Sequence, residues 1–260
     1  MKVLITGTKG FIAGQLKCYF NNPLEINEDA LVTTEWLDEH NPDAVFHVGA
    51  CSNTLETDVN YIMVVNFEST KTLTDWCKAN NKPLVYSSSA ASYGTNGEYP
   101  SNLYGWSKYT AEQYVISNGG IALRYFNVYG PGEEHKGKMA SMAYQMFKAG
   151  NAKLFPGDPK RDFIYVDDVV SANLHALAHY SDLLGKKYDV GLGAAHGFEY
   201  IADTLEIPYT YHDVSAIPEG YQFYTCSDIK DWMPGWAPQY SLSKGLLSAK
   251  AYWTTLEKQV

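Results

Sequence analysis

Short apolar runs alternate along this chain with segments whose apolar residues recur at helical spacing. The apolar runs predict strands at 3–6, 44–50, 83–87, 121–128 and 163–166. The helical patterns predict helices near 66–80, 104–117 and 138–149. Strands that alternate with helices in this way are typical of an α/β fold with a doubly wound parallel sheet.

The last third of the chain is less regular. The run Tyr-Asp-Val-Gly-Leu-Gly at 188–193, followed by a helical stretch from about Phe198, predicts one more strand and helix. The stretch from Ile207 to Tyr240 is rich in Pro, Tyr and Trp and shows no clear period. We expect it to belong to a small C-terminal α/β lobe that binds a substrate.

The first strand leads into a glycine-rich turn. Val3–Thr6 is followed by Gly7 and Gly10, and then by a helical pattern that runs to about Phe20. Such a strand-turn-helix directs backbone N–H groups and the positive helix end at a pyrophosphate, as in Rossmann folds. Two glycines alone are weak support, because any tight turn can use them.

Composition limits the class of protein. The chain has 260 residues, of which 45% are hydrophobic, and its net charge of -9 argues against general binding to nucleic acid or acidic membranes. Its four cysteines lack metal-ligand spacing, so we expect no metal site, no disulfide framework and a reduced, cytoplasmic compartment. No apolar run approaches the ~18 residues of a membrane span, and the first strand begins too early for a signal peptide.

Tyr104 and Lys108 lie four residues apart on a predicted helix, downstream of Ser87, Ser88 and Ser89. This spacing puts the phenol and the ammonium on one helix face, where the cation favours the ionised phenol and lets it act as a base. Such pairs also arise by chance in a chain with 21 tyrosines. Serines at strand ends are often turn formers, which is our interpretation of Ser87.

The segments described above, taken in their order along the chain, resemble those of a known enzyme family. Over nearly its whole length the chain resembles the extended short-chain dehydrogenase/reductases of the nucleotide-sugar epimerase group. The matching segments are Thr-Gly-Thr-Lys-Gly-Phe-Ile at 6–12, Val-Phe-His-Val-Gly-Ala at 45–50, Val-Tyr-Ser-Ser-Ser-Ala-Ala-Ser-Tyr-Gly at 85–94, Tyr-Gly-Trp-Ser-Lys at 104–108, Arg-Tyr-Phe-Asn-Val-Tyr-Gly-Pro at 124–131 and Arg-Asp-Phe-Ile-Tyr-Val-Asp-Asp-Val at 161–169. Segments 49–54 and 135–141 are similar to the members that invert carbon 6 of an ADP-heptose.

The resemblance implies an isomerase, in which NADP takes a hydride from carbon 6 of the heptose and returns it to the other face. It implies that Tyr104 and Lys136 are the acid/base groups on opposite faces, and that Ser89 donates a hydrogen bond to the reacting oxygen. Lys108 would lower the pKa of the tyrosine and bind the nicotinamide ribose. Without the resemblance, Lys136 would be interpreted as a solvated loop lysine beside Lys138.

The resemblance also implies binding residues and domains. The residues expected to hold the dinucleotide are Gly7, Lys9, Gly10, Phe11, Ile12, Val48, Gly49, Ala50, Asn66, Tyr104 and Lys108. The residues expected to hold a nucleotide sugar are Ser52, Ser89, Asn127, Lys138, Arg161, Tyr221 and Gln222. The expected domains are a dinucleotide-binding domain at 1–130, completed by about 162–192, and a substrate-binding lobe formed by 131–161 and 193–260. We expect a homo-oligomer with no nucleic-acid or membrane partner.

Arg161 is assigned to the diphosphate of the substrate, because a planar guanidinium can hold phosphate oxygens in pairs. A salt bridge with Asp158 or Asp162 is the alternative interpretation. Asn127, at a predicted strand end, is either a substrate contact or a turn residue. A family arginine close to the Tyr-Gln pair of the lobe is Gly220 here, which is a departure from the pattern.

The largest departure lies between Phe20 and Ala44. One strand-helix-strand unit takes about 30 residues, whereas 21–43 can hold little more than a strand at Pro23–Ile26 and a helix at Ala30–His40. We therefore expect the sheet to be shortened between the first helix and the fourth family strand. The strand that normally presents the selector for the adenosine ribose is expected to be missing or merged.

The shortened segment bears on the choice of cofactor. No convincing acidic residue ends a second strand to hold a ribose 2'-hydroxyl, although Glu25 and Glu28 lie at about the expected distance from the turn. Lys9 lies inside the turn, where a cation could meet a 2'-phosphate. We therefore favour NADP, with NAD as the alternative, while Lys9 could equally be a solvent-facing loop residue.

Three functions remain open from the sequence. The first is the NAD(P)-dependent 6-epimerase. The second is another nucleotide-sugar 4-epimerase, reductase or dehydratase, and dehydration is disfavoured because Ala90 and Ala91 replace the Thr-Asp-Glu run of the dehydratases. The third is a non-catalytic dinucleotide-binding protein, which the shortened adenosine side favours and the retained Ser89, Tyr104 and Lys136 oppose.

Overall fold

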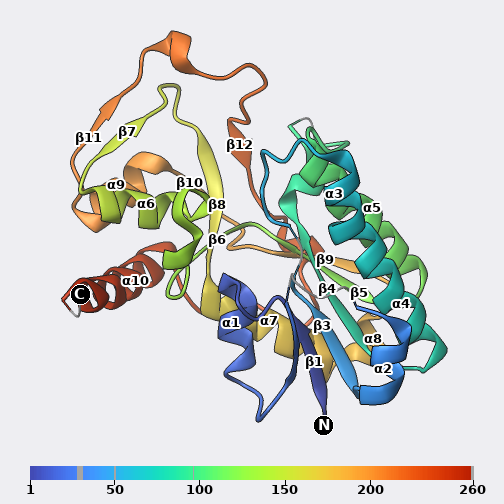
Figure 1. Ribbon diagram of the computed structural model, residues 1–260. Coiled ribbons are helices and arrows are strands. Elements are labelled where there is room, and N and C mark those ends of the chain that lie inside the picture. Colours follow the sequence, from blue (N-terminus) through green and yellow to red (C-terminus); the bar gives the residue numbers. More distant parts are fainter. Residues whose placement is uncertain (28–31, 50, 96, 259–260) are drawn as a thin grey trace.

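The computed structural model describes residues 1–27, 32–49, 51–95 and 97–258. Within these residues the centre of the molecule is a six-stranded parallel sheet in the order β2-β1-β3-β4-β5-β9 (Figure 1). Its strands are β1 (Val3–Thr6), β2 (Leu24–Ile26), β3 (Ala44–His47), β4 (Leu84–Ser89), β5 (Ile121–Tyr125) and β9 (Lys187–Val190). The predicted α/β class with a doubly wound parallel sheet is confirmed.

Helices cover both faces of this sheet, so β1, β3 and β5 are buried along their whole length. On one face, α1 (Phe11–Lys17) contacts α7 (Val166–Ala178), which leads into α8 (Tyr180–Leu183). On the other face, α4 (Ser69–Ala79) lies between α5 (Leu103–Ser117) and α2 (Thr34–His40) (Figure 1). A short helix α3 (Val59–Met63) and a π-helical turn (Val64–Glu68) lead into α4.

A lobe built from later parts of the chain lies beside the carboxyl ends of the strands (Figure 1). Its larger sheet is centred on β8 (Lys160–Tyr165), which pairs with β6 (Asn127–Tyr129), β10 (Ala195–Gly197) and β12 (Tyr224–Thr225). Its other elements are β7 (Ala152–Leu154), β11 (Tyr209–Tyr211), α6 (Met142–Ala149), α9 (Phe198–Leu205) and α10 (Leu242–Glu257). The lobe has its own apolar cluster around Phe163, Leu246 and Trp253. The predicted domain boundaries stay predictions.

Several predicted boundaries were wrong. The run 121–128 is not one strand, because the chain breaks at Phe126: β5 belongs to the central sheet and β6 pairs with β8 in the lobe. Val166 begins α7 instead of ending a strand. The first helix ends at Lys17, and the helix expected from 138 begins at Met142, after a 3₁₀ turn.

The strand predicted at Pro23–Ile26 is present as β2. The expectation that the strand presenting the ribose selector is missing or merged was wrong. β2 pairs in parallel with β1, with Thr6 opposite Ile26, which is the place of the second strand in the Rossmann order. In the described part of the chain the sheet ends at β2. The predicted helix 30–40 is described only from 32 onward, and α2 begins at Thr34.

None of the described helices combines the length and apolarity that crossing a membrane requires. Among the same residues, no group of three or more His, Cys, Asp or Glu side chains is placed to hold a metal ion. The structure pairs none of the four cysteines, all of them described, in a disulfide bond. A cytoplasmic location and a homo-oligomeric state stay predictions.

Candidate active site

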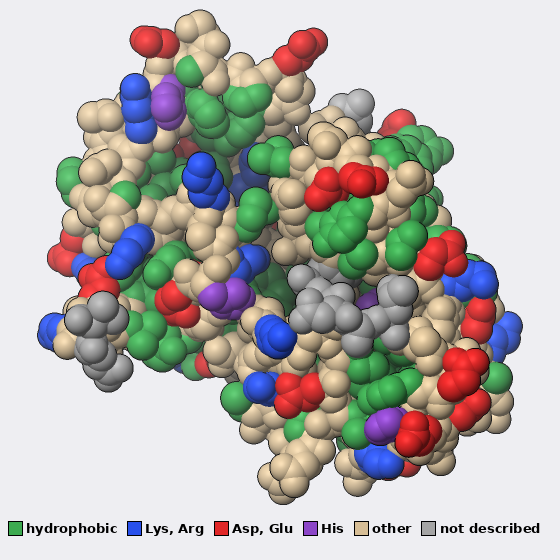
Figure 2. Space-filling model, viewed as in Figure 1, with side chains coloured by type: hydrophobic (Ala, Val, Ile, Leu, Met, Phe, Trp, Pro, Cys, Tyr) green, Lys and Arg blue, Asp and Glu red, His purple; other side chains and the backbone are tan. Residues whose placement is uncertain are grey.

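A cavity of about 460 Å³ opens at the carboxyl ends of β1, β2 and β3. It is lined by Gly7, Lys9, Gly10, Phe11, Ile12, Ala13, Asn27, Val48, Gly49, Ser52, His135, Lys136 and Met139. Most residues predicted to hold the dinucleotide therefore lie together, and Lys136 reaches the same cavity from the lobe. Figure 2 shows the surface hollowed between the lobe and the side that carries α3 and α5. Ala50 lies outside the described residues.

The glycine turn is shaped for close approach. Gly7 has a φ of +72°, and a Cβ there would lie 2.5 Å from the Cα of Gly49. Only glycine combines an unstrained positive φ with the absence of a Cβ. The turn after β1 can therefore lie directly against the end of β3. The N–H of Gly10 donates to the Gly7 carbonyl over 2.8 Å, and no side chain caps α1. This turn fits the pyrophosphate of a dinucleotide.

His47 ties this turn to the helix layer. Its Nδ1 lies 2.8 Å from the Thr6 hydroxyl and its Nε2 lies 2.8 Å from the Thr70 hydroxyl. The Thr6 hydroxyl also accepts the N–H of Gly49 over 2.9 Å. Burial and the nearby charge of Lys108 lower the pKa of His47 to about 3. The sequence analysis did not single out His47. The pattern that could have identified it is a polar residue inside a run of apolar ones.

Ser89 lies beside Tyr104. Ser89 ends β4, its hydroxyl accepts the N–H of Ala91 over 3.1 Å, and it acts to lower the pKa of the Tyr104 phenol. Tyr104 lies in the first turn of α5, where the Asn102 side chain caps the helix by accepting the N–H of Gly105 over 2.8 Å. The cap fixes where the helix starts and therefore where the phenol points.

The Lys108 ammonium is bound to β4, and its effect on the pKa of Tyr104 stays a prediction. Its ammonium donates to the Ser87 carbonyl over 2.8 Å and lies 5.1 Å from the centre of the Tyr86 ring. Burial lowers the pKa of Lys108 to about 8. Burial raises the pKa of Tyr104, the thiol of Cys51 adds to the rise, and the Ser89 hydrogen bond opposes it.

Asn66, a predicted cofactor residue, is fully buried. Its Oδ1 accepts the N–H of Cys51 over 2.8 Å, and its Nδ2 donates to the Cys51 carbonyl over 3.1 Å and to the Ser107 hydroxyl over 2.8 Å. In this structure the amide joins the loop after β3 to α5 instead of facing the cavity. It thereby positions Ser52, the next residue of that loop, on the cavity wall.

Arg161 lies in the lobe among aromatic and carbonyl groups. Its guanidinium donates to the carbonyls of Lys160, over 3.0 Å, and Gln222, and lies 5.4 Å from the centre of the Tyr221 ring. The alternative of a salt bridge is not found among the described residues, where Asp158 pairs with Lys160 over 3.0 Å. Burial lowers the pKa of Arg161, so a bound anion would offset a real desolvation cost.

The other residues predicted to hold substrate are spread more widely. The amide of Gln222 donates to the Gly94 carbonyl over 2.8 Å and so links the lobe to the loop after β4. Asn127 is exposed and donates to the Asp162 carbonyl over 2.8 Å. Lys138 is exposed and does not line the cavity. Of the residues predicted to hold substrate, all of which the structure describes, only Ser52 lines the cavity.

The parallel sheet, the glycine turn and the Ser89–Tyr104–Lys108 group define a dinucleotide-dependent enzyme of the short-chain dehydrogenase/reductase type. The chain belongs to the NAD dependent epimerase/dehydratase family, which it matches over residues 20–191. It is similar to the ADP-L-glycero-D-manno-heptose-6-epimerase of Brachyspira hyodysenteriae, with 38% identity over 226 residues, covering 76% of this chain and 70% of that protein. The predicted family and the predicted epimerase class are confirmed.

Solved structures share this fold. The crystal structure of the Helicobacter pylori ADP-L-glycero-D-manno-heptose-6-epimerase is 26% identical, with a TM-score of 0.83, and the match covers 96% of this chain and 95% of that one. The UDP-glucose 4-epimerase of Thermotoga maritima, solved with UDP-glucose, is 21% identical with a TM-score of 0.84, covering 99% and 100%. At that identity the likeness concerns the fold alone.

Proposed function

We propose that this chain inverts carbon 6 of an ADP-heptose, with NADP as its bound cofactor. The observation that carries the proposal is the position of Lys136, a lobe residue that lines the same cavity as Gly7 and Gly10 of the glycine turn. The contact between Ser89 and Tyr104 supplies the second reacting group. The 38% identity to a heptose 6-epimerase supports the choice of sugar.

The bound dinucleotide would supply the acceptor and the donor of the hydride. Tyr104 and Lys136 would exchange protons with the oxygen on carbon 6, one for each face of the carbon. Ser89, which already contacts Tyr104, would donate a hydrogen bond to the same oxygen. Lys108 would hold the nicotinamide ribose, and the guanidinium of Arg161 would hold the diphosphate.

The environment of Lys136 supports a role in proton exchange. It is partly buried, and its ammonium lies 5.8 Å from the centre of the Phe11 ring at the start of α1. Burial lowers the pKa of Lys136, while the charge of Glu133 opposes the lowering. A lysine whose pKa is closer to neutrality gives up and regains its proton more readily at physiological pH.

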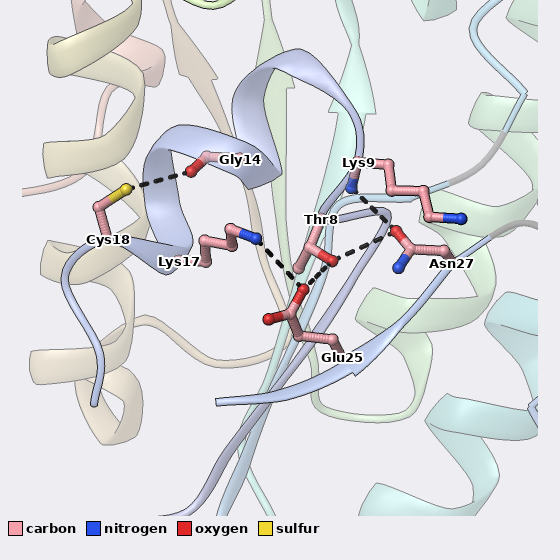
Figure 3. Close-up of polar contacts among 7 residues, drawn as sticks. All are labelled: Thr8, Lys9, Gly14, Lys17, Cys18, Glu25 and Asn27. Atoms are coloured by element: carbon pink, nitrogen blue, oxygen red, sulfur yellow. Dashed lines mark hydrogen bonds and ion pairs between the residues drawn. The ribbon is translucent and has the colours of Figure 1, made fainter. Parts of the chain in front are cut away.

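The preference for NADP is supported by the end of β2 (Figure 3). The residue that follows β2 is Asn27, whose Oδ1 accepts the N–H of Lys9 over 2.9 Å and the Thr8 hydroxyl over 3.2 Å. Glu25 accepts a hydrogen bond from Thr8 and does not line the cavity, whereas Lys9 does. A cation in the lining of the cavity, inside the glycine turn, suits a 2'-phosphate. Glu28 lies outside the described residues.

The test is an NMR time course of the purified protein with ADP-D-glycero-D-manno-heptose and NADP. Inversion at carbon 6 is the expected result. A protein that binds NADP without inverting this sugar would point to a different nucleotide sugar, with a 4-epimerase as the next candidate. A protein that shows neither inversion nor cofactor binding, by saturation-transfer signals in the same tube, would instead support the non-catalytic alternative.

A further inference from the structure

The loop that carries Lys136 is closed by a single carboxylate. The loop runs from Gly130, just after β6, to Ser141, which caps α6. Glu133 within it is fully buried. Its Oε1 accepts the N–H of Gly130 and the hydroxyl of Ser141, each over 2.9 Å, and its Oε2 accepts the N–H of Ser141. Both ends of the loop are therefore bound to one side chain.

The closed loop is docked on α1, the helix that follows the glycine turn. The Gln15 amide donates to the Pro131 carbonyl over 3.0 Å. Gly132 packs against the same amide, since a Cβ there would lie 2.5 Å from the Gln15 nitrogen. On the other side of the loop, the Lys136 ammonium lies over the Phe11 ring. The closed ends and these contacts together determine where Lys136 meets the cavity.

The charge of Glu133 is held within the loop. Burial raises the pKa of Glu133, but the bonds from Gly130 and Ser141, together with the charge of Lys136, oppose the rise. A buried carboxylate is costly unless hydrogen-bonded or paired. Here both oxygens are bonded within the loop, so the group stabilises the loop conformation and places a negative charge near Lys136.

We propose that Glu133 is a positioning residue: its carboxylate closes the loop 130–141 and thereby holds Lys136 at the dinucleotide cavity. Without this closure the loop ends are held by fewer bonds, and the lysine samples more positions, so ordering it for reaction costs entropy. The part played by Lys136 in proton exchange rests on the proposed function. Its placement beside the cofactor can be measured without the sugar.

The variant Glu133→Gln tests the closure, because it keeps the shape of the side chain but removes its charge and one acceptor. Glu134→Gln is the matched control, since it makes the same charge change one residue further on, on a partly exposed side chain. Labelling with acetic anhydride, followed by peptide mass spectrometry, gives the modification rate of Lys136. Lys138, exposed on the same loop, is the internal reference.

Saturating NADP, with NAD run in parallel, should slow labelling of Lys136 about fivefold or more in the wild type and in Glu134→Gln, but less than about twofold in Glu133→Gln. Equal protection in all three proteins would overturn the proposal. Absence of protection in the wild type would do the same, because Lys136 would then not lie beside the cofactor. If Glu133→Gln fails to fold, Ser141→Ala, which removes one donor, should show a partial loss of protection.

Kinetics separate positioning from general structural damage. In Glu133→Gln, kcat for inversion at carbon 6 should fall about tenfold while KM changes less than about twofold, since a misplaced base affects the chemical step. Glu134→Gln should match the wild type. A rise in KM with unchanged kcat would contradict a positioning role. A wild type that protects Lys136 but does not invert the sugar would refute the proposed function and leave the placement of Lys136 intact.

Discussion

The two ends of the predicted cofactor site are built differently. On the reaction side, the 15-residue α5 buries Glu112, which binds Arg124 over 2.6 and 2.7 Å and accepts the Ser88 hydroxyl over 2.7 Å. On the adenosine side, β2 has three residues and ends the sheet, and the ion pair of Lys17 and Glu25 is exposed and 3.5 Å long. The reaction side is therefore held by buried polar contacts, whereas the adenosine side is held by an exposed ion pair at the edge of the sheet.

This difference follows from what each side has to do. A displacement of about 1 Å in the groups that exchange protons can cost two orders of magnitude in rate. The adenosine end contributes binding free energy at a distance from the reaction, so it tolerates a looser support. Loss of an outer strand is therefore less damaging beside β2 than it would be beside β4 or β5.

The largest expected effect is on the reaction side. Tyr104→Phe should lower kcat by about 10²–10⁴-fold, because a proton-exchanging group is removed. The dissociation constant of NADP should change by less than about threefold. Tyr114→Phe is the control, since it removes a phenol at the surface of the same helix, where the hydroxyl donates to Asp75. A Tyr104→Phe protein that keeps near-wild-type kcat would remove Tyr104 from the mechanism.

A pair of carboxylate changes compares the two sides directly. Glu112→Gln should lower the free energy of unfolding by about 3–5 kcal/mol, because it leaves the buried guanidinium of Arg124 without its charged partner. Glu25→Gln should change it by less than about 1 kcal/mol, because its ion pair is exposed to solvent. Urea unfolding of both variants measures the difference. Similar losses in the two would show that the adenosine side is as firmly held as the reaction side.

The histidine beneath the turn should make the protein sensitive to acid. The pKa of His47 is about 3 in the folded chain, below its ordinary value of 6.5. Between these two values the unfolded chain binds a proton at His47 and the folded chain does not. This contribution is fully present above pH 6.5 and is lost as pH falls toward 3, by about 1.4 kcal/mol per pH unit. In urea titrations at several pH values, His47→Gln should show a correspondingly shallower dependence. Parallel curves for the two proteins would contradict a buried neutral His47.

The sequence predicted the parts of the molecule that a local pattern specifies. The apolar runs gave β1, β3, β4 and β9 to within a few residues, because a strand covered on both faces has few other compositions. The break at Phe126 could not be predicted, since both halves of that run are apolar and only the packing of the lobe separates them. The strand predicted at Pro23–Ile26 is β2, but only its pairing with β1 shows that it takes the place of the second strand of the sheet.

In the candidate site, too, local motifs could be predicted and contacts that depend on packing could not. The glycine turn and Lys136 could be named from motifs, and the structure brings them to one cavity. Glu133 and His47, the buried partners of these groups, could not be predicted from motifs. They act through hydrogen bonds to backbone atoms or to residues distant in sequence. The pKa of Tyr104 also depends on burial, which helical spacing does not reveal.

The smallest expected effect concerns the adenosine side. Lys9→Ala should weaken NADP binding about tenfold and NAD binding less than about twofold, because the ammonium is expected to face the 2'-phosphate that only NADP carries. Lys17→Ala is the control, since Lys17 lies on α1 outside the cavity lining, beside Glu25. Calorimetric titration of both cofactors gives the two ratios. Equal weakening of NADP and NAD would remove the argument for NADP, and Asn27, at the end of β2, would then be the residue to test for contact with an unphosphorylated ribose.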